Sequence, residues 1–197
     1  MAISSYRESF CGNHKYQNPN LLIASARAGN VIGGGDWSKD RLVPDIVRSL
    51  SLKRSIVLRN PKSIRPWQHV LDPLYGYLCL AKKLYECQLN KKGEKSFFAS
   101  AFNFGPKTSS ARTVEELAQK FLNYWEGEYE INFDISKYHE ANTLNLISDK
   151  AIKYLDWQPK WDFEKTIKNT ADWYFEVNKG KDAFNKCLEN IVEYNDY

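Results

Sequence analysis

The segment that decides the fold is Leu21-Leu22-Ile23-Ala24-Ser25-Ala26, followed at once by Arg27-Ala28-Gly29-Asn30-Val31-Ile32-Gly33-Gly34-Gly35-Asp36-Trp37. A short, continuous apolar run is typical of a strand buried on both faces in a parallel sheet. The glycine-rich stretch behind it predicts a long loop. Because α/β folds bind ligands beyond the carboxyl ends of their strands, this junction is the first place to expect a site.

Strands and helices alternate along the rest of the chain, which predicts the α/β class. Further strands are expected at 55–58, 101–104 and 131–134, and helices at 3–10, 45–50, 74–85, 113–125, 148–155 and 163–177. Pro44 suits the first position of its helix, and Thr113 with Glu116 has the S/T-x-x-E form of a capping box. Turns are expected at Asn60-Pro61 and Arg65-Pro66, and a polar loop at 89–96.

Composition excludes several classes of protein. The 197 residues carry 28 Lys and Arg against 24 Asp and Glu, a formal charge of +4, and the basic residues are spread rather than clustered as in nucleic-acid-binding proteins. The first residues lack the apolar core of a signal peptide, and no apolar run reaches the ~18 residues of a membrane span. Four cysteines without a C-x-x-C pair predict reduced thiols and a cytoplasmic location. No metal-ligand spacing stands out.

Polar side chains expected at strand ends or in loops offer an anion site: Arg27, Asn30, Arg41, Arg65 and His69. Two or three guanidinium forks with an amide can hold a pyrophosphate, although each arginine alone could equally form a surface ion pair. Trp37 and Trp67 could stack on a ring or simply pack. His69 and Asp72 could form a helix-start hydrogen bond or act in catalysis. His139 and Glu140 could be an acid–base pair or an ordinary loop.

Several motifs resemble the extended short-chain dehydrogenase/reductase family, and within it the branch of CDP-glucose 4,6-dehydratases. They are the stretch Arg27–Trp37 quoted above, Asp40-Arg41-Leu42-Val43-Pro44-Asp45, Arg59-Asn60-Pro61, Ser63-Ile64-Arg65-Pro66-Trp67-Gln68-His69-Val70-Leu71, Asn103-Phe104-Gly105-Pro106 and His139-Glu140-Ala141. The resemblance extends from about Ile3 to Val177. It implies the C-terminal part of a Rossmann fold, with the end of its parallel sheet, plus a small mixed α/β substrate lobe. Residues 1–50 would be the remainder of the NAD-binding domain and 51–197 mainly the lobe, with the chain interleaved between them.

The resemblance also implies a hydro-lyase that converts CDP-glucose to CDP-4-keto-6-deoxyglucose with bound NAD, acts as a homo-oligomer, and feeds dideoxyhexose synthesis for bacterial surface polysaccharide. Asn30, Arg41 and Arg65 would hold the substrate diphosphate, and Leu42 with Val43 would line the nucleotide pocket. His139 and Glu140 would close over the nucleotide. Ala28 and Gly29 would pass near the nicotinamide.

Departures from the family pattern limit this expectation. The 197 residues contain no G-x-x-G-x-x-G turn after a strand and no Tyr-x-x-x-Lys, so we expect a C-terminal fragment that neither holds NAD nor dehydrates sugar by itself. Ile147 and Asp149 stand where relatives carry Asp and Ser, which moves the expected helix cap to Ser148. Two alternatives remain: a non-catalytic nucleotide-sugar-binding or complementing module, and another nucleotide-sugar dehydratase or epimerase.

Overall fold

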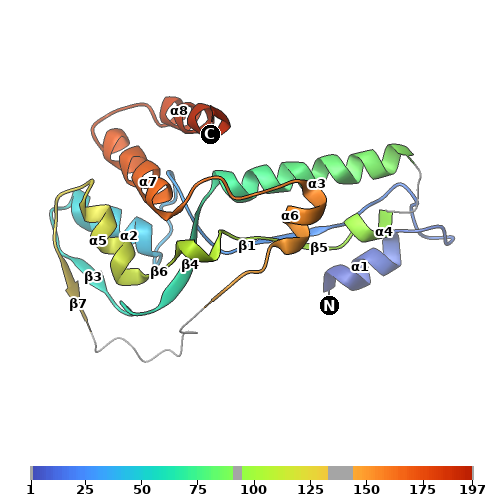
Figure 1. Cartoon of the computed structure of the whole chain (residues 1–197), viewed down its shortest axis with the longest axis horizontal. Coiled ribbons are helices and arrows are strands. Elements are labelled where there is room, and N and C mark those ends of the chain that lie inside the picture. The colour runs from blue at the N-terminus through green and yellow to red at the C-terminus, as the bar shows by residue number, and fades with distance from the viewer. Residues whose placement is uncertain (1, 91–94, 133–143, 197) are drawn as a thin grey trace. The chain divides into compact units, whose positions relative to one another are not determined.

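The computed structural model describes residues 2–90, 95–132 and 144–196, and it divides into two compact units (Figure 1). Unit 1 comprises Met1–Ala28, Pro73–Phe104 and Ile147–Gln158, and unit 2 comprises Gly29–Asp72, Gly105–Leu146 and Pro159–Tyr197. The units alternate along the sequence. The assignment of residues 1–50 to a cofactor domain and 51–197 mainly to a substrate lobe stays a prediction.

Unit 1 is built on two parallel strands, β1 (Ser25–Ala28) and β5 (Ala101–Phe104), with Ser25 opposite Ala101. Its helices are α1 (Ala2–Phe10), α3 (Leu71–Asn90, which enters the unit at Pro73), α4 (Lys95–Phe98) and α6 (Asp149–Leu155). Phe104 meets Trp157 edge-on at 5.1 Å in the core. A Cβ on Gly76 would lie 2.3 Å from the Phe104 ring, so the glycine lets α3 approach the strand closely.

The expected strand at 21–26 is displaced: β1 begins at Ser25 and ends at Ala28. It pairs with β5 from Ser25 opposite Ala101 to Ala28 opposite Phe104, and the Ser25 amide also donates to the Ser100 carbonyl at 3.0 Å. The expected loop at 89–96 is also partly wrong, since Leu89 and Asn90 end α3 and Lys95–Phe98 form α4. The helix cap does move to Ser148, as expected, although its side chain makes no capping hydrogen bond.

Unit 2 holds a three-stranded sheet in the order β2 (Asn30–Ile32), β4 (Ile64–His69), β6 (Ala111–Thr113), and a parallel pair, β3 (Ile56–Leu58) with β7 (Tyr129–Ile131). Strand β4 pairs parallel with β2 and antiparallel with β6. The helices are α2 (Leu42–Ser51), α5 (Val114–Leu122), α7 (Phe163–Asn178) and α8 (Ala183–Asp196), with a 3-10 turn, η1, at Thr108–Ser110. Apolar residues from α2, α5, α7 and the strands share one core.

Two expectations about prolines in this unit are wrong, and in both places the N–H that proline lacks is not needed for a hydrogen bond. The turn expected at Arg65-Pro66 is part of β4, where Pro66 faces Ala111 and the pairing with β2 begins only at Trp67, so the missing N–H breaks no bond to β2. Pro44 is the third residue of α2, not the first. The first four amides of a helix have no partner within it, so a proline is tolerated throughout the first turn.

The long loop expected at 27–37 contains the end of β1 and all of β2, because tertiary pairing with β4 makes a strand of three residues that lack a strand signal of their own.

The sequence analysis also missed α8. Its apolar spacing, with Phe184, Leu188 and Ile191 at i, i+4 and i+7, is a helix signal.

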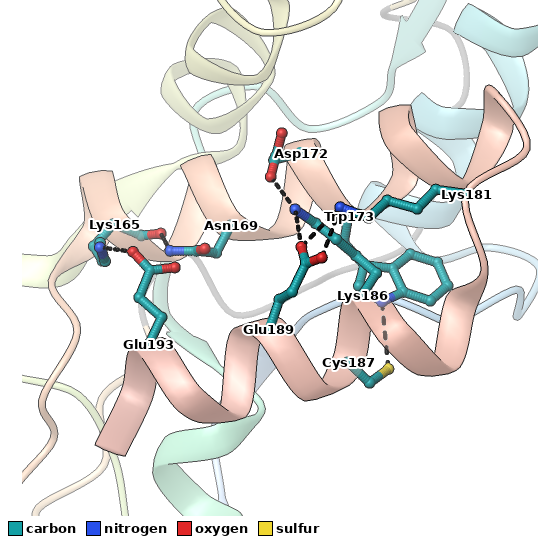
Figure 2. A network of polar contacts seen from close by, with 9 residues as sticks. All are labelled: Lys165, Asn169, Asp172, Trp173, Lys181, Lys186, Cys187, Glu189 and Glu193. Carbon is teal, nitrogen blue, oxygen red and sulfur yellow. Dashed lines mark hydrogen bonds and ion pairs between the residues drawn. The ribbon is translucent and has the colours of Figure 1, made fainter. Parts of the chain in front are cut away.

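Helix α8 is attached to α7 through polar contacts, which Figure 2 shows from close by. The buried Lys186 binds Asp172 of α7 and lies 3.4 Å from Glu189, while Lys165 of α7 binds Glu193. Burial lowers the pKa of Lys186, but the hydrogen bonds and charges of the two carboxylates outweigh it and the pKa is raised. The charged side of α8 therefore faces α7. Four of its apolar residues are exposed, Phe184, Leu188, Ile191 and Val192, while Tyr194 is buried.

The predicted capping box is confirmed at the start of α5. The Thr113 hydroxyl accepts the Glu116 amide at 3.1 Å, and the Glu116 carboxylate accepts the Thr113 amide at 2.7 Å. The helix ends at Leu122, earlier than the expected Trp125. Since Leu117, Ala118 and Phe121 are buried in the core of unit 2, the cap stabilises a helix that closes one side of that core.

We expect Thr113→Ala to lower the free energy of unfolding by about 1 kcal/mol, because an orphan amide at the helix start loses its acceptor. Thr113→Ser keeps the hydroxyl and should stay close to the wild type. Urea unfolding followed by circular dichroism measures both. Equal losses in the two variants would show that the cap contributes nothing.

Candidate functional site

A cavity of about 540 Å³ opens in unit 2 where β2, β4 and the start of α2 meet. Its volume lies within the ~300–1,000 Å³ typical of small-molecule sites. Its walls mix apolar, basic and acidic side chains with exposed backbone. The lining residues are Gly29, Asn30, Val31, Ile32, Gly33, Asp36, Asp40, Arg41, Leu42, Val43, Pro44, Arg65, Trp67 and Val114.

The N-terminus of α2 forms part of the cavity wall. Arg41 is the N-cap in extended conformation, its side chain makes no capping hydrogen bond, and Leu42 and Val43 follow as the first helical residues. The first amides of a helix have no intrahelical acceptor and carry the positive end of its dipole. This end of the cavity therefore favours an anion, and phosphate groups bind at such helix starts.

Side chains of both signs surround the helix start. Arg41 lies 3.7 Å from Asp36 and keeps 66% of its side chain exposed, while Arg59, outside the cavity, pairs with Asp40 at 3.2 Å. Arg65 is partly buried in β4, where it lies opposite Arg112 of β6. The lining thus contains two guanidinium groups, of Arg41 and Arg65, and two carboxylates, of Asp36 and Asp40. Any anion that binds must compete with Asp36 for Arg41.

In the turn at Gly33–Asp36, close neighbours leave no room for a side chain at Gly33 or Gly34, and the backbone at Gly35 is left-handed. A Cβ on Gly34 would lie 2.0 Å from Trp173 of α7, and Gly35 has a φ of +86°. A dinucleotide pyrophosphate needs a glycine turn that runs directly into a helix. Here α2 begins only at Leu42, and Trp173 fills the space beside Gly34. The described residues therefore do not form the glycine turn that would bind the pyrophosphate of NAD.

The structure brings together five of the eight predicted site residues. Asn30, Arg41, Leu42, Arg65 and Gly29 all line the cavity, and their roles toward a ligand stay predictions. Ala28 is the last residue of β1 in unit 1, and its neighbour Arg27 belongs to the same strand. His139 and Glu140 lie outside the described residues.

The sequence analysis missed the acidic residues of the cavity and the aromatic support behind it. Asp36 and Asp40 each stand within five residues of Arg41, a local signal for ion pairing that could have been used. Tyr174 is 138 residues from Asp36 in sequence, yet the two are hydrogen bonded. No local pattern could have found that contact.

Of the two tryptophans, Trp67 is buried and donates its indole N–H to the Arg112 carbonyl at 3.0 Å, so it packs as part of the cavity wall. Trp37 remains 55% exposed and meets Tyr174 edge-on at 5.3 Å. In these contacts, neither tryptophan ring lies parallel to another aromatic ring. Trp37 therefore packs against Tyr174 while it remains open to solvent.

His69 and Asp72 both make buried contacts within unit 2. His69 is buried against Trp161, and its Nδ1 accepts the Leu71 amide at 3.3 Å. Asp72 accepts the Lys160 amide at 2.7 Å and the Tyr194 hydroxyl at 2.9 Å. Burial lowers the pKa of His69 to about 3 and raises that of Asp72 to about 6. Neither residue is among those that line the cavity.

These two shifts act on stability in opposite directions. Between pH 4 and 6 the unfolded chain binds about one more proton at His69, whose unfolded pKa is 6.5, so acid destabilises the fold. Over the same window the folded chain binds one more proton at Asp72, whose unfolded pKa is 3.8, so acid stabilises it. The two contributions largely cancel in the wild type.

We expect Asp72→Asn to remove the acid-stabilising contribution of Asp72, so that the opposite contribution of His69 is no longer offset. The unfolding free energy of the variant, relative to wild type, should fall by up to about 1.4 kcal/mol per pH unit as pH is lowered from 6 to 4. Urea unfolding at pH 4.5, 5.5 and 6.5 measures the difference, and the exposed Glu126→Gln serves as the charge-matched control. A pH-independent difference between Asp72→Asn and wild type would overturn this account.

Solved structures with a similar fold define the class. The dTDP-glucose 4,6-dehydratase of Bacillus anthracis in complex with NAD superimposes with a TM-score of 0.63 at 16% identity, covering 91% of this chain and 50% of that one. DesIV, a dTDP-glucose 4,6-dehydratase of Streptomyces venezuelae, gives 0.66 at 17%, covering 88% and 47%. UDP-glucuronic acid 4-epimerase of Bacillus cereus gives 0.66 at 11%, covering 89% and 49%. The chain has part of the extended short-chain dehydrogenase/reductase fold of nucleotide-sugar dehydratases and epimerases.

In sequence the chain is similar to a particular enzyme of this class. It is 39% identical over 195 residues to the CDP-glucose 4,6-dehydratase of Salmonella typhimurium. The match covers 98% of this chain and 52% of the relative, so the chain spans about half the length of that protein. No protein-family model matches the sequence.

The described residues contain no helix that is both long and apolar enough to cross a membrane. Within the same residues, no group of three or more His, Cys, Asp or Glu side chains is placed to hold a metal ion.

Proposed function

We propose that this chain is the nucleotide-sugar-binding half of a CDP-glucose 4,6-dehydratase, and that the cavity in unit 2 holds the nucleotide diphosphate. One observation carries the proposal: the start of α2, Arg41, Arg65 and Asn30 converge on a single cavity. The 39% identity to a CDP-glucose 4,6-dehydratase over 98% of the chain supports the choice of substrate.

The chemistry of the cavity suits a nucleoside diphosphate. Guanidinium forks match phosphate oxygens in bidentate geometry, and the Asn30 amide can donate further hydrogen bonds. Leu42, Val43 and Val114 supply apolar surface beside the polar groups. The oxidation and reduction of the sugar would come from NAD, a hydride acceptor and donor, and the residues described here provide the binding and orientation of the substrate.

We expect Arg65→Ala and Arg41→Ala to weaken CDP binding by about 10- to 100-fold each, since a hydrogen bond to a charged group contributes about 1.5–3 kcal/mol. Isothermal titration calorimetry with CDP measures this. Arg54→Ala removes the same charge outside the cavity lining and should bind as the wild type does. If all three variants bind alike, the cavity is not the diphosphate site.

The base and sugar are tested by competition. We expect CDP-glucose to bind more tightly than dTDP-glucose and UDP-glucuronic acid in the same calorimetric assay. The structural similarity to an epimerase keeps a second candidate open, another nucleotide-sugar dehydratase or epimerase. Tighter binding of dTDP-glucose or UDP-glucuronic acid would favour that candidate over a CDP-glucose enzyme.

We expect the 197-residue chain by itself to retain no stoichiometric NAD and to show no dehydratase activity. Its sequence holds neither the glycine turn for the pyrophosphate nor a Tyr-x-x-x-Lys for proton transfer. Heat release of bound nucleotide followed by chromatography measures the NAD content. NAD bound at one per chain would contradict this expectation, and binding of CDP without NAD would agree with a nucleotide-sugar-binding module.

The wider setting stays a prediction. Homo-oligomerisation, a cytoplasmic location and a role in dideoxyhexose or O-antigen synthesis are implied by the sequence resemblance. None of them is needed for the cavity to bind a nucleotide diphosphate.

A further inference from the structure

The turn that carries Gly33 and Asp36 into the cavity wall is held from behind by α7. The Tyr174 hydroxyl donates to the Asp36 carbonyl at 2.7 Å and accepts the Asp36 amide at 3.0 Å. One hydroxyl thus binds both backbone groups of a single residue. Because Tyr174 is 1% exposed, water does not compete for these bonds.

We propose that Tyr174 is a positioning residue for the nucleotide-diphosphate cavity, holding the backbone of Asp36 and thereby placing the carboxylate that restrains Arg41. The proposal rests on the proposed function, because it assigns a supporting role in the same site. Tyr174 does not line the cavity itself, and it acts on the cavity through Asp36, which does.

The link from Asp36 to Arg41 is electrostatic. One carboxylate oxygen of Asp36 accepts the Ser38 amide at 2.9 Å, and the other lies 3.7 Å from the Arg41 guanidinium. Burial opposes ionisation of Asp36, but the Ser38 hydrogen bonds and the charges of Arg41 and Arg48 outweigh it and lower its pKa. The 3.7 Å contact is longer than a good charge-assisted hydrogen bond. Asp36 therefore orients Arg41 without holding it so tightly that a phosphate could not take it over.

The hydroxyl remains a donor over the working pH range. Burial raises the pKa of Tyr174 to about 12, against the opposing Asp36 amide hydrogen bond. The contact with Asp36 is therefore present wherever the protein is folded. A change of pH between 6 and 9 should not release the turn through this residue.

Neighbouring contacts fix the rest of the turn and separate packing from positioning. Trp173 fills the space beside Gly34, and its indole N–H donates to the Cys187 sulfur of α8 at 3.3 Å (Figure 2). Arg48 of α2 donates to the carbonyls of Trp37 and Ser38 at 3.0 and 3.1 Å. A phenylalanine at position 174 would keep the ring and its edge-on contact with Trp37. Only the two bonds to Asp36 would be lost.

The test compares two buried tyrosines in unit 2. Tyr174→Phe removes the bonds to Asp36, whereas Tyr194→Phe removes a buried hydroxyl that donates to Asp72. We expect the Kd for CDP to rise about 5- to 10-fold in Tyr174→Phe and to stay within twofold in Tyr194→Phe. Urea unfolding shows whether the two variants lose stability to a similar extent.

Two further readouts separate positioning from a general loss of structure. Amide exchange of residues 33–38 in the ligand-free protein should accelerate in Tyr174→Phe and not in Tyr194→Phe. If Tyr174 acts through Arg41, the Tyr174→Phe substitution should weaken CDP binding less than twofold in an Arg41→Ala background.

The outcomes are distinct. If the wild type fails to bind CDP, the proposed function fails before the variants are compared. If the wild type binds and Tyr174→Phe binds equally well, the positioning role is wrong while the proposed function stands. An equal rise in Kd for both tyrosine variants would also overturn the positioning role, since loss of stability alone would then explain it.

Discussion

The site depends on the packing of α7 against the three-stranded sheet of unit 2. Apolar residues of α7, among them Ile167, Ala171 and Trp173, share a core with Ile32 of β2 and Trp67 of β4. This places the Trp173–Tyr174 pair directly behind the glycine turn. Because protein cores are densely packed, the side chains of α7 have few alternative positions, and this restricts the position of the turn and of the cavity wall.

Electrostatic balance in the cavity follows from that placement. The start of α2 provides a positive helix end, while Arg41 and Arg65 add formal charge close to it. Asp36 lies 3.7 Å from Arg41 and offsets part of this charge, while Asp40 pairs with Arg59 outside the cavity lining. An anion that replaces Asp36 at Arg41 exchanges one ion pair for another, which favours selectivity for a well-shaped diphosphate over nonspecific attraction.

Helix α8 illustrates how tertiary structure can reverse an ordinary amphipathic pattern. Lys186 and Glu193 of α8 pair with Asp172 and Lys165 of α7, and Lys186 also lies 3.4 Å from Glu189 of its own helix. The Lys186 side chain is 9% exposed, whereas Asp172 and Glu189 keep 43% and 50% of theirs exposed, so this contact favours the observed orientation of α8 mainly by pairing the buried ammonium group. The same orientation leaves Phe184, Leu188, Ile191 and Val192 exposed.

Of the five predicted residues that line the cavity, Gly29 and Leu42 came only from the resemblance to a known family. The sequence by itself determined the α/β class, β5, the capping box at Thr113 and the helices α6 and α7. These features depend on neighbours within a few positions, where periodicity, capping and turn chemistry act. Tertiary structure decided the rest. Strand β2 exists because β4 pairs with it, Pro66 is accepted because the pairing changes beside it, and Tyr174 reaches Asp36 across 138 residues. Such contacts depend on which elements the fold brings together, and no local pattern of residues contains that information.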